Sequence, residues 1–226
     1  LPGAAAVVDH RPVVRLRQLV RAPAPAGVVR GEISRRIDAL RVGPGDQATS
    51  DLGPLITREH RDRVASYVDG APHEGATVVR DGAAEIEKPG FFFGPSLLDH
   101  VTPEMRCYRD EIFGPVLSVV RVATYAEAIE VVNNNPYGNG VAVFTRDGNV
   151  ARQFSRDVTV GMIGINVPIP VPVASYSFGG WKDSLFGHAH MYGPEGFAFF
   201  TRGKVVTTRW PQPSDSQIDL GFPRTR

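Results

Sequence analysis

Strand-like and helix-like segments alternate along the second half of the chain, and this alternation most constrains the fold. A continuous run rich in β-branched residues at 114–122 is typical of a buried strand, and further strands are expected over residues 141–145 and 162–166. Amphipathic helical patterns over residues 125–132 and 149–157 lie between these runs. Because strands that alternate with helices usually pair in parallel, the sequence predicts an α/β fold with a mostly parallel sheet.

The preceding residues extend the same pattern. Ile33, Ile37 and Leu40 recur at helical spacing in a first predicted helix. Thr57 has the character of an N-cap for a second helix, whose apolar stripe includes Val64. Further strands are expected over residues 76–79 and 91–98.

Composition excludes several classes of protein. The 226 residues carry 25 Lys and Arg against 24 Asp and Glu, a net charge of +1 that argues against a general nucleic-acid binder. No apolar run approaches the ~20 residues of a membrane helix. A single cysteine, Cys107, closes no internal disulfide, so we expect a reducing compartment, the cytoplasm. No signal peptide is visible, and Leu1 in place of Met hints at a cut or partial chain.

The two ends of the chain differ from its middle. Residues 1–31 are rich in Ala, Val, Arg and Pro, and we predict an atypical, poorly ordered segment there, with a basic arm for an acidic partner as the alternative. Residues 211–226 are predicted to be a mobile tail. A late strand is expected over residues 204–208.

Common catalytic and metal motifs are not found. The sequence has no Gly-x-Gly-x-x-Gly after a strand, no Walker loop and no Gly-x-Ser-x-Gly elbow. His188 and His190 flank Ala189, but no carboxylate or cysteine accompanies them at ligand spacing. We therefore predict no metal site.

Four motifs in a fixed order carry a resemblance. They are Asp-Glu-Ile-Phe-Gly-Pro-Val at 110–116, Asn-Asn-Asn-Pro-Tyr-Gly-Asn-Gly at 133–140, Gly-Met-Ile-Gly-Ile-Asn at 161–166 and Phe-Gly-Gly-Trp-Lys at 178–182. Together they resemble the C-terminal part of the NAD(P)-dependent aldehyde dehydrogenase superfamily, from about residue 32 to Trp210. The Cys-Tyr pair at 107–108 and the Pro-rich loop at 166–172 resemble the CoA-acylating methylmalonate-semialdehyde dehydrogenases.

The resemblance implies roles for four residues. Glu111 matches the family's ligand for the nicotinamide ribose, and a carboxylate can accept hydrogen bonds from two vicinal hydroxyls. Phe113 matches a residue near the nicotinamide. Phe178 resembles the aromatic wall of the aldehyde tunnel. Asn166 matches the end of the third motif; from its position after a predicted strand we interpret it as a structural residue whose amide pairs loop backbone groups, with substrate binding as the alternative. Taken without the resemblance, Glu111 is a solvated side chain and both phenylalanines are core residues.

Cys107 does not match the family's nucleophile. In the family a cysteine thiolate attacks the aldehyde and a hydride passes to NAD. The resemblance places that cysteine near residues 13–17, where this sequence has none, and makes Cys107 a partly buried structural thiol. The dinucleotide-binding domain would lie further upstream. The loop at 187–193 lacks the Glu of many hydrolytic relatives, which favours acyl transfer to CoA over water.

These observations lead to one interpretation with an alternative. Residues 32–203 are expected to form part of an aldehyde-dehydrogenase catalytic domain, and residues 204–210 an oligomerisation strand. The resemblance implies NAD-dependent, CoA-acylating oxidation of methylmalonate semialdehyde to propanoyl-CoA, with NAD as cofactor and CoA as co-substrate. We expect the isolated chain to be inactive and to form a homo-oligomer. The alternative is an inactive remnant or pairing module that associates with a full-length subunit.

Overall fold

The computed structural model describes residues 6–10, 16–21, 26–171, 175–177, 179–208 and 210, with side chains from residue 30 onward. Phe178 and the predicted tail at 211–226 lie outside the described residues. The elements are, in chain order, β1 (Ala6–His10), β2 (Leu16–Arg21), α1 (Ala26–Asp38), α2 (Arg58–Gly70), η1 (Ala71–Glu74), β3 (Thr77–Arg80), η2 (Ala83–Glu87), β4 (Ser96–Asp99), α3 (Arg106–Arg109), β5 (Val116–Arg121), α4 (Tyr125–Asn134), β6 (Tyr137–Gly138), β7 (Gly140–Phe144), α5 (Gly148–Asp157), β8 (Met162–Ile165), β9 (Trp181–Lys182) and α6 (Gly193–Phe199).

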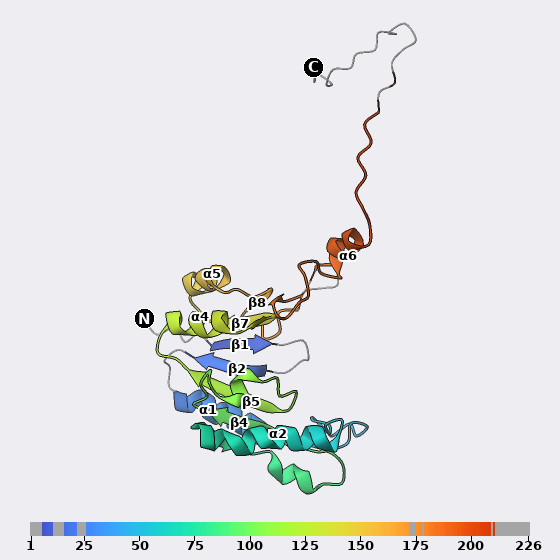
Figure 1. The fold of residues 1–226 in the computed structure, drawn as a ribbon. Coiled ribbons are helices and arrows are strands. Elements are labelled where there is room, and N and C mark those ends of the chain that lie inside the picture. The colour runs from blue at the N-terminus through green and yellow to red at the C-terminus, as the bar shows by residue number, and fades with distance from the viewer. Residues whose placement is uncertain are drawn as a thin grey trace.

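A seven-stranded sheet in the order β3-β4-β5-β2-β1-β7-β8 organises the molecule (Figure 1). Three of its six pairings are parallel, namely β4–β5, β2–β5 and β7–β8. The other three, β3–β4, β1–β2 and β1–β7, are antiparallel. The α/β class is confirmed. The sheet is mixed rather than mostly parallel, because β1 pairs antiparallel with both β2 and β7, and β3 pairs antiparallel with β4.

The N-terminal segment differs from the prediction of loose structure. β1 and β2 form a hairpin that lies between β5 and β7. β2 pairs with β5 at four residues, and β1 pairs with β7 at five. The backbone hydrogen bonds of this hairpin therefore join β3-β4-β5 to β7-β8 in one sheet. The Pro- and Arg-rich composition of the segment does not reveal this pairing.

Local capping explains where the main helices begin. The hydroxyl of Thr57 accepts a hydrogen bond from the His60 amide at 3.1 Å and starts α2. Thr124 caps α4 through the Glu127 amide, and Asp147 caps α5 through the Asn149 amide. Each cap satisfies an amide that the first helical turn leaves unpaired, so the predicted helices begin close to their expected positions.

The core lies where the helices pack on the sheet. Val64 of α2, Leu98 of β4, Val141 and Val143 of β7 and Phe154 of α5 are 0% exposed. Figure 1 shows α1 and α2 beside β4 and β5, and α4 and α5 beside β7 and β8. Burial of these apolar side chains stabilises the helices that surround the candidate site.

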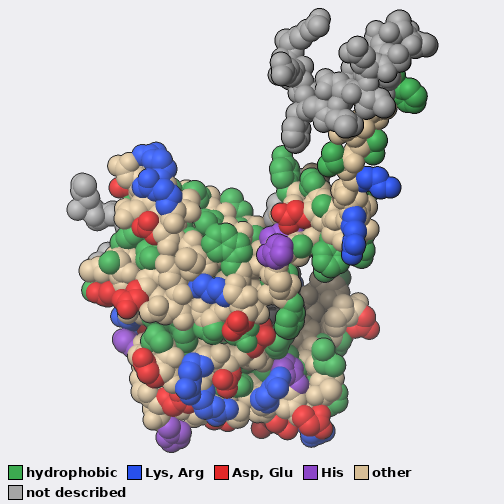
Figure 2. Space-filling model, turned by 45° about the horizontal axis from the view of Figure 1, so that its top comes forward, with side chains coloured by type: hydrophobic (Ala, Val, Ile, Leu, Met, Phe, Trp, Pro, Cys, Tyr) green, Lys and Arg blue, Asp and Glu red, His purple; other side chains and the backbone are tan. Residues whose placement is uncertain are grey.

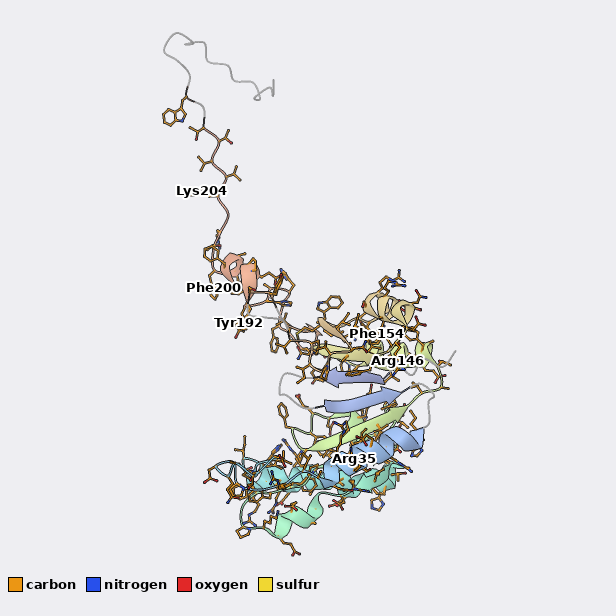
Figure 3. The ribbon with its side chains drawn as sticks, turned by 180° about the vertical axis from the view of Figure 1, so that it is seen from behind. Arg35, Arg146, Phe154, Tyr192, Phe200 and Lys204 are labelled. Carbon is orange, nitrogen blue, oxygen red and sulfur yellow. The ribbon has the colours of Figure 1, made fainter. Side chains whose placement is uncertain are left out.

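The C-terminal segment extends away from this body. Figure 3 labels Tyr192, Phe200 and Lys204 along an arm formed by α6 and the residues after it. Residues 201–208 form no helix and pair with none of the strands in the described part of the chain. The oligomerisation strand expected at 204–210 therefore stays a prediction, since the strand that would pair with it belongs to a second subunit.

Candidate functional site

The 110–114 loop connects α3 to β5 and carries two of the predicted site residues. Ile112 is 7% exposed and anchors the loop in the core, whereas the neighbouring Phe113 is 45% exposed. Glu111, on the other side of Ile112, is half-buried. Burial of Ile112 thus leaves the carboxylate of Glu111 and the aromatic side chain of Phe113 nearer the surface on either side of it.

Helix α2 holds both ends of this loop. The Tyr67 hydroxyl donates to the Asp110 carboxylate at 3.0 Å. Burial, and then the hydrogen bond to Asp110, raise the pKa of Tyr67, so its hydroxyl keeps its proton and remains a donor. At the far end, His60 Nε2 lies 2.9 Å from the Phe113 carbonyl oxygen. The guanidinium of Arg106 covers the Tyr67 ring at 4.8 Å.

The strands that flank the site run in one direction. β2 is parallel to β5 and antiparallel to β1, and β1 is antiparallel to β7, so β5, β7 and β8 share a direction. The 110–114 loop precedes β5 and thus lies beyond the amino ends of these strands. This differs from the usual site at the carboxyl ends of an open α/β sheet.

The glycines of the Phe-Gly-Gly-Trp-Lys motif lie toward the same end. A Cβ on Gly161, which precedes β8, would overlap the carbonyl oxygen of Gly179. A Cβ on Gly180 would lie 3.0 Å from Cα of Asn139, which precedes β7. Only glycine allows these close backbone approaches. The motif therefore packs against the starts of β7 and β8, although Phe178 itself is not described.

Asn166 lies at the opposite end of the sheet. It directly follows β8 and adopts φ +56°. Its side-chain oxygen accepts from the Thr145 amide at 2.9 Å, and its side-chain nitrogen donates to the Thr145 carbonyl at 3.0 Å. Both atoms of the amide group are thereby used to join the ends of β7 and β8, an arrangement that fits the structural interpretation of Asn166.

Cys107 is held inside the core. Its side chain lies in α3 and the residue is 5% exposed. Burial, and next the negative charge of Glu74, raise the pKa of the Cys107 thiol. A buried thiol with a raised pKa forms little of the reactive thiolate. The geometry agrees with a structural thiol.

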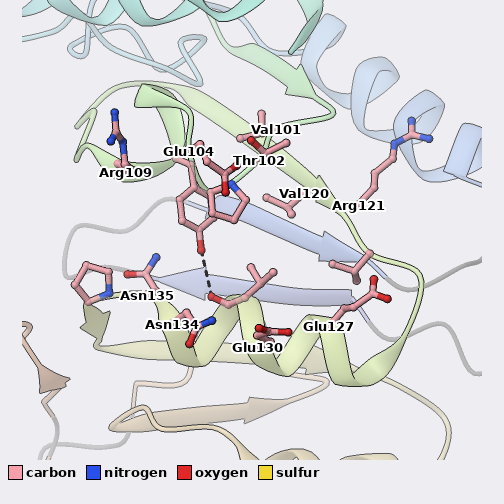
Figure 4. A pocket seen from close by; sticks show the side chains of 15 residues that line it. Val101, Thr102, Glu104, Arg109, Val120, Arg121, Glu127, Glu130, Asn134 and Asn135 are labelled. Carbon is pink, nitrogen blue, oxygen red and sulfur yellow. Dashed lines mark hydrogen bonds between the residues drawn. The ribbon is translucent and has the colours of Figure 1, made fainter. Parts of the chain in front are cut away.

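A cavity of about 700 Å³ lies between α4 and the segment 101–109 (Figure 4). Its apolar wall includes Val101, Val120 and Val131, and Glu130 is among its charged residues. Across it, the Tyr108 hydroxyl donates to the Val131 carbonyl at 3.2 Å. None of the predicted site residues that the structure describes lines this cavity, so it is separate from the 110–114 loop.

Two groups of contacts were not predicted from the sequence. The first is the set of α2 side chains against the 110–114 loop, which lies 43–53 residues further along the chain. The second joins α6 to the segment before it: Ser177 Oγ lies 2.8 Å from His190 Nδ1 and donates to Glu195 at 3.1 Å. The His190 amide, and next the Ser177 hydroxyl, lower the pKa of Glu195. Helical spacing alone carries no signal for such distant partners.

Comparison with known proteins assigns the family. The aldehyde dehydrogenase family model matches residues 24–206. Malonate-semialdehyde dehydrogenase from Pseudomonas aeruginosa is 52% identical over 192 residues, which are 83% of this chain and 39% of that protein. The chain belongs to the aldehyde dehydrogenase family, and it spans about two fifths of the length of such relatives.

Solved structures give the same result. The crystal structure of methylmalonate-semialdehyde dehydrogenase from Oceanimonas doudoroffii matches with a TM-score of 0.83 and 47% identity, over 89% of this chain and 42% of that one. A Mycobacterium tuberculosis aldehyde dehydrogenase complexed with NAD⁺ matches with a TM-score of 0.74 and 31% identity, over 85% of this chain and 39% of that one. The resemblance in the sequence motifs is thus confirmed at the level of the fold. Within the part of the chain that has described positions, no helix is long and apolar enough to cross a membrane.

Proposed function

We propose that this chain supplies the nicotinamide-facing part of a semialdehyde dehydrogenase that transfers its acyl product to CoA. The observation that carries the proposal is the 110–114 loop, in which a half-buried Glu111 and a 45% exposed Phe113 flank the anchored Ile112. The family match and the similarity to malonate- and methylmalonate-semialdehyde dehydrogenases support it.

The residues of this loop fit the nicotinamide half of NAD. A carboxylate at Glu111 can accept hydrogen bonds from both hydroxyls of a ribose. The exposed Phe113 ring offers a flat apolar surface to the adjoining nicotinamide. When bound, NAD supplies the acceptor for the hydride that leaves the aldehyde carbon. The role of these residues is to bind and orient that acceptor beside the substrate.

The overall reaction that we propose balances without a further reactant. Methylmalonate semialdehyde, NAD⁺ and CoA give propanoyl-CoA, CO₂ and NADH. The aldehyde carbon loses a hydride to NAD⁺ and forms a thioester bond to the CoA sulfur. The bond to the carboxylate breaks and releases CO₂, and the carbon that carried the carboxylate takes the proton lost by the CoA thiol. The substrate chemistry follows the relatives, and we assign the reaction to the cytoplasm because a lone cysteine suits a reducing compartment.

Cys107 does not serve as the nucleophile in this proposal. The resemblance places the nucleophile elsewhere, and the thiol is 5% exposed with a raised pKa. We therefore expect no turnover by the isolated 226-residue chain, whereas we expect NAD binding at Glu111 and Phe113.

The test separates cofactor binding from turnover. Binding of NAD to the purified chain is measured by saturation-transfer NMR on the nicotinamide protons. We expect a signal that Glu111→Gln reduces and that Glu87→Gln, an exposed carboxylate in η2, leaves unchanged. A signal that is absent, or equal in both variants, refutes the assignment of Glu111.

Turnover is measured as NADH formation at 340 nm with methylmalonate semialdehyde, NAD and CoA. No reaction agrees with a chain that lacks the nucleophile. Activity that disappears in Cys107→Ala would contradict our assignment, since Cys107 would then have to be the nucleophile.

A second candidate function is association with a full-length subunit. The observation that favours it is the apolar surface of the C-terminal arm, where Phe197, Phe200 and Val205 are 77%, 82% and 94% exposed (Figure 2). Size-exclusion chromatography with light scattering tests it: the chain alone should form a homo-oligomer, and a full-length relative added in excess should take it into a mixed species. A monomer under both conditions refutes both forms of association.

A further inference from the structure

One face of α2 contacts the 110–114 loop along its length. His60, Val64 and Tyr67 are spaced four and three residues apart, so they lie on the same side of the helix. Tyr67 bonds Asp110 at the start of the loop. His60 bonds the Phe113 carbonyl near its end. Val64, 0% exposed, packs beside Gly114, where an added Cβ would lie 2.6 Å from both Val64 methyl carbons.

The backbone at Phe113 needs this support. Its φ is +53°, a left-handed conformation that costs a residue with a side chain roughly 1 kcal/mol or more. Such a conformation persists only where the surroundings hold it. The hydrogen bond from α2 ends on the carbonyl of this same residue, so it acts directly on the strained peptide unit.

The direction of that hydrogen bond follows from the second partner of the imidazole. Arg63 Nη2 lies 2.9 Å from His60 Nδ1. A guanidinium has only donors, so Nδ1 accepts from Arg63. The ring proton therefore resides on Nε2, which donates it to the Phe113 carbonyl oxygen. Arg63 fixes the tautomer that the contact with Phe113 requires.

We propose that His60, oriented by Arg63, is a positioning residue for the Glu111–Phe113 surface. It holds Phe113 in the left-handed conformation that leaves the ring 45% exposed beside Glu111. This inference rests on the proposed function, in which that surface faces the nicotinamide. The His60 side chain contacts the loop at the Phe113 carbonyl, so in this proposal it acts on the cofactor through Phe113.

Hydrogen–deuterium exchange of the full chain tests the positioning. Loss of one hydrogen bond to the loop in His60→Ala should speed exchange of a peptide spanning residues 109–116 about tenfold. His60→Gln should restore exchange to within about threefold, because its amide can donate to Phe113 and accept from Arg63. The matched control is His73→Ala, an exposed histidine of η1 outside this contact.

The variants also separate the two proposals. NAD binding, measured by the same saturation-transfer NMR, should weaken in His60→Ala and recover in His60→Gln. Faster loop exchange with no NAD signal in any variant would refute the proposed function and leave the positioning role intact. Unchanged loop exchange in His60→Ala, or acceleration spread evenly over all peptides, would refute the positioning role whatever NAD does. Arg63→Ala gives an independent check. Without the hydrogen bond from Arg63, the His60 tautomer is no longer fixed, so exchange of the 109–116 peptide should accelerate by a smaller factor than in His60→Ala.

Discussion

Removing the arginine that neutralises a buried carboxylate should destabilise the whole sheet. Asp99 ends β4, and its side chain is 1% exposed. Arg121, at the end of β5, donates to both carboxylate oxygens at 2.9 and 2.5 Å. Burial alone would raise the pKa of Asp99, but the Arg121 hydrogen bonds and then the His100 amide outweigh it and lower the pKa. The carboxylate is therefore charged in the folded state.

The size of the stability loss depends on the partners that Asp99 keeps after Arg121→Met. Removing one partner of a fully buried ion pair costs about 3–5 kcal/mol. The Arg121 side chain is 36% exposed, and Asp99 keeps the His100 amide at 2.8 Å and Arg30 at 3.9 Å. We therefore expect a loss of about 2–3 kcal/mol in the free energy of unfolding. For a chain of this size that lowers Tm by about 5–10 °C.

Urea unfolding followed by circular dichroism measures this loss, with Arg152→Met, an exposed arginine of α5, as the control. In an Asp99→Asn background, Arg121→Met should cost less than about 1 kcal/mol, because no buried charge is then left unpaired. The reasoning is refuted if Arg121→Met lies within about 0.5 kcal/mol of the wild type, or if its cost is the same in the Asp99→Asn background.

The pH dependence has a defined sign. In the wild type the lowered pKa makes Asp99 contribute stability above its unfolded pKa of about 3.9, and this contribution is lost as the pH falls through the lower folded value. In Arg121→Met, Asp99 stays buried but loses its two strongest hydrogen bonds, so its pKa should rise above the unfolded value. Protonation of Asp99 then removes the buried charge that destabilises the variant. The difference in the free energy of unfolding between Arg121→Met and the wild type should therefore narrow as the pH falls from 7 to about 4.5.

Three further predictions follow from other parts of the structure. Gly114→Ala should lower the free energy of unfolding by about 1–3 kcal/mol, measured by urea unfolding, because the new Cβ meets the Val64 methyl groups at 2.6 Å. Cys107 should react with a thiol reagent at least about 100-fold more slowly in the native chain than in urea, since it is 5% exposed and its pKa is raised. Deleting residues 1–24 removes β1 and β2, so the amides of β7 should lose hydrogen-exchange protection, whereas retained protection would show that β5 and β7 are held together without the hairpin.

Elements defined by local patterns could be predicted from the sequence. The Thr57 cap, the apolar stripe through Val64 and the β-branched run of β5 each depend on residues within one or two turns or along one strand. Their energetics are dominated by capping and by burial of one face, which spacing reveals. The positions of α2, α4, α5, β5, β7 and β8 therefore agree closely with the expected ranges.

Features that depend on distant partners could not be predicted. β1 and β2 lie in a segment whose composition indicates loose structure, and their pairing partners are more than ninety residues further along the chain. The left-handed conformation of Phe113 is invisible in a motif without glycine at that position. For the site, the motif identified Glu111 and Phe113, but the contact with His60 required the packed α2.

The direction of the strands also defines what the proposed site still requires. The loop carrying Glu111 and Phe113 lies beyond the amino end of β5, and both neighbours of that strand, β2 and β4, are parallel to it. A nucleophile that attacks an aldehyde beside the nicotinamide would have to reach this end of the sheet, and the resemblance places it near residues 13–17, where β2 begins. The sole cysteine lies instead in α3 and is buried, and residues 13–17 contain no thiol. In our proposal, cofactor orientation and bond-making chemistry are thus separable: the first depends on α2 and the 110–114 loop, and the second requires a nucleophile other than Cys107. A mixture with a full-length relative whose own 110–114 loop carries the equivalent of Glu111→Gln should then regain NADH formation only if the two chains share one site.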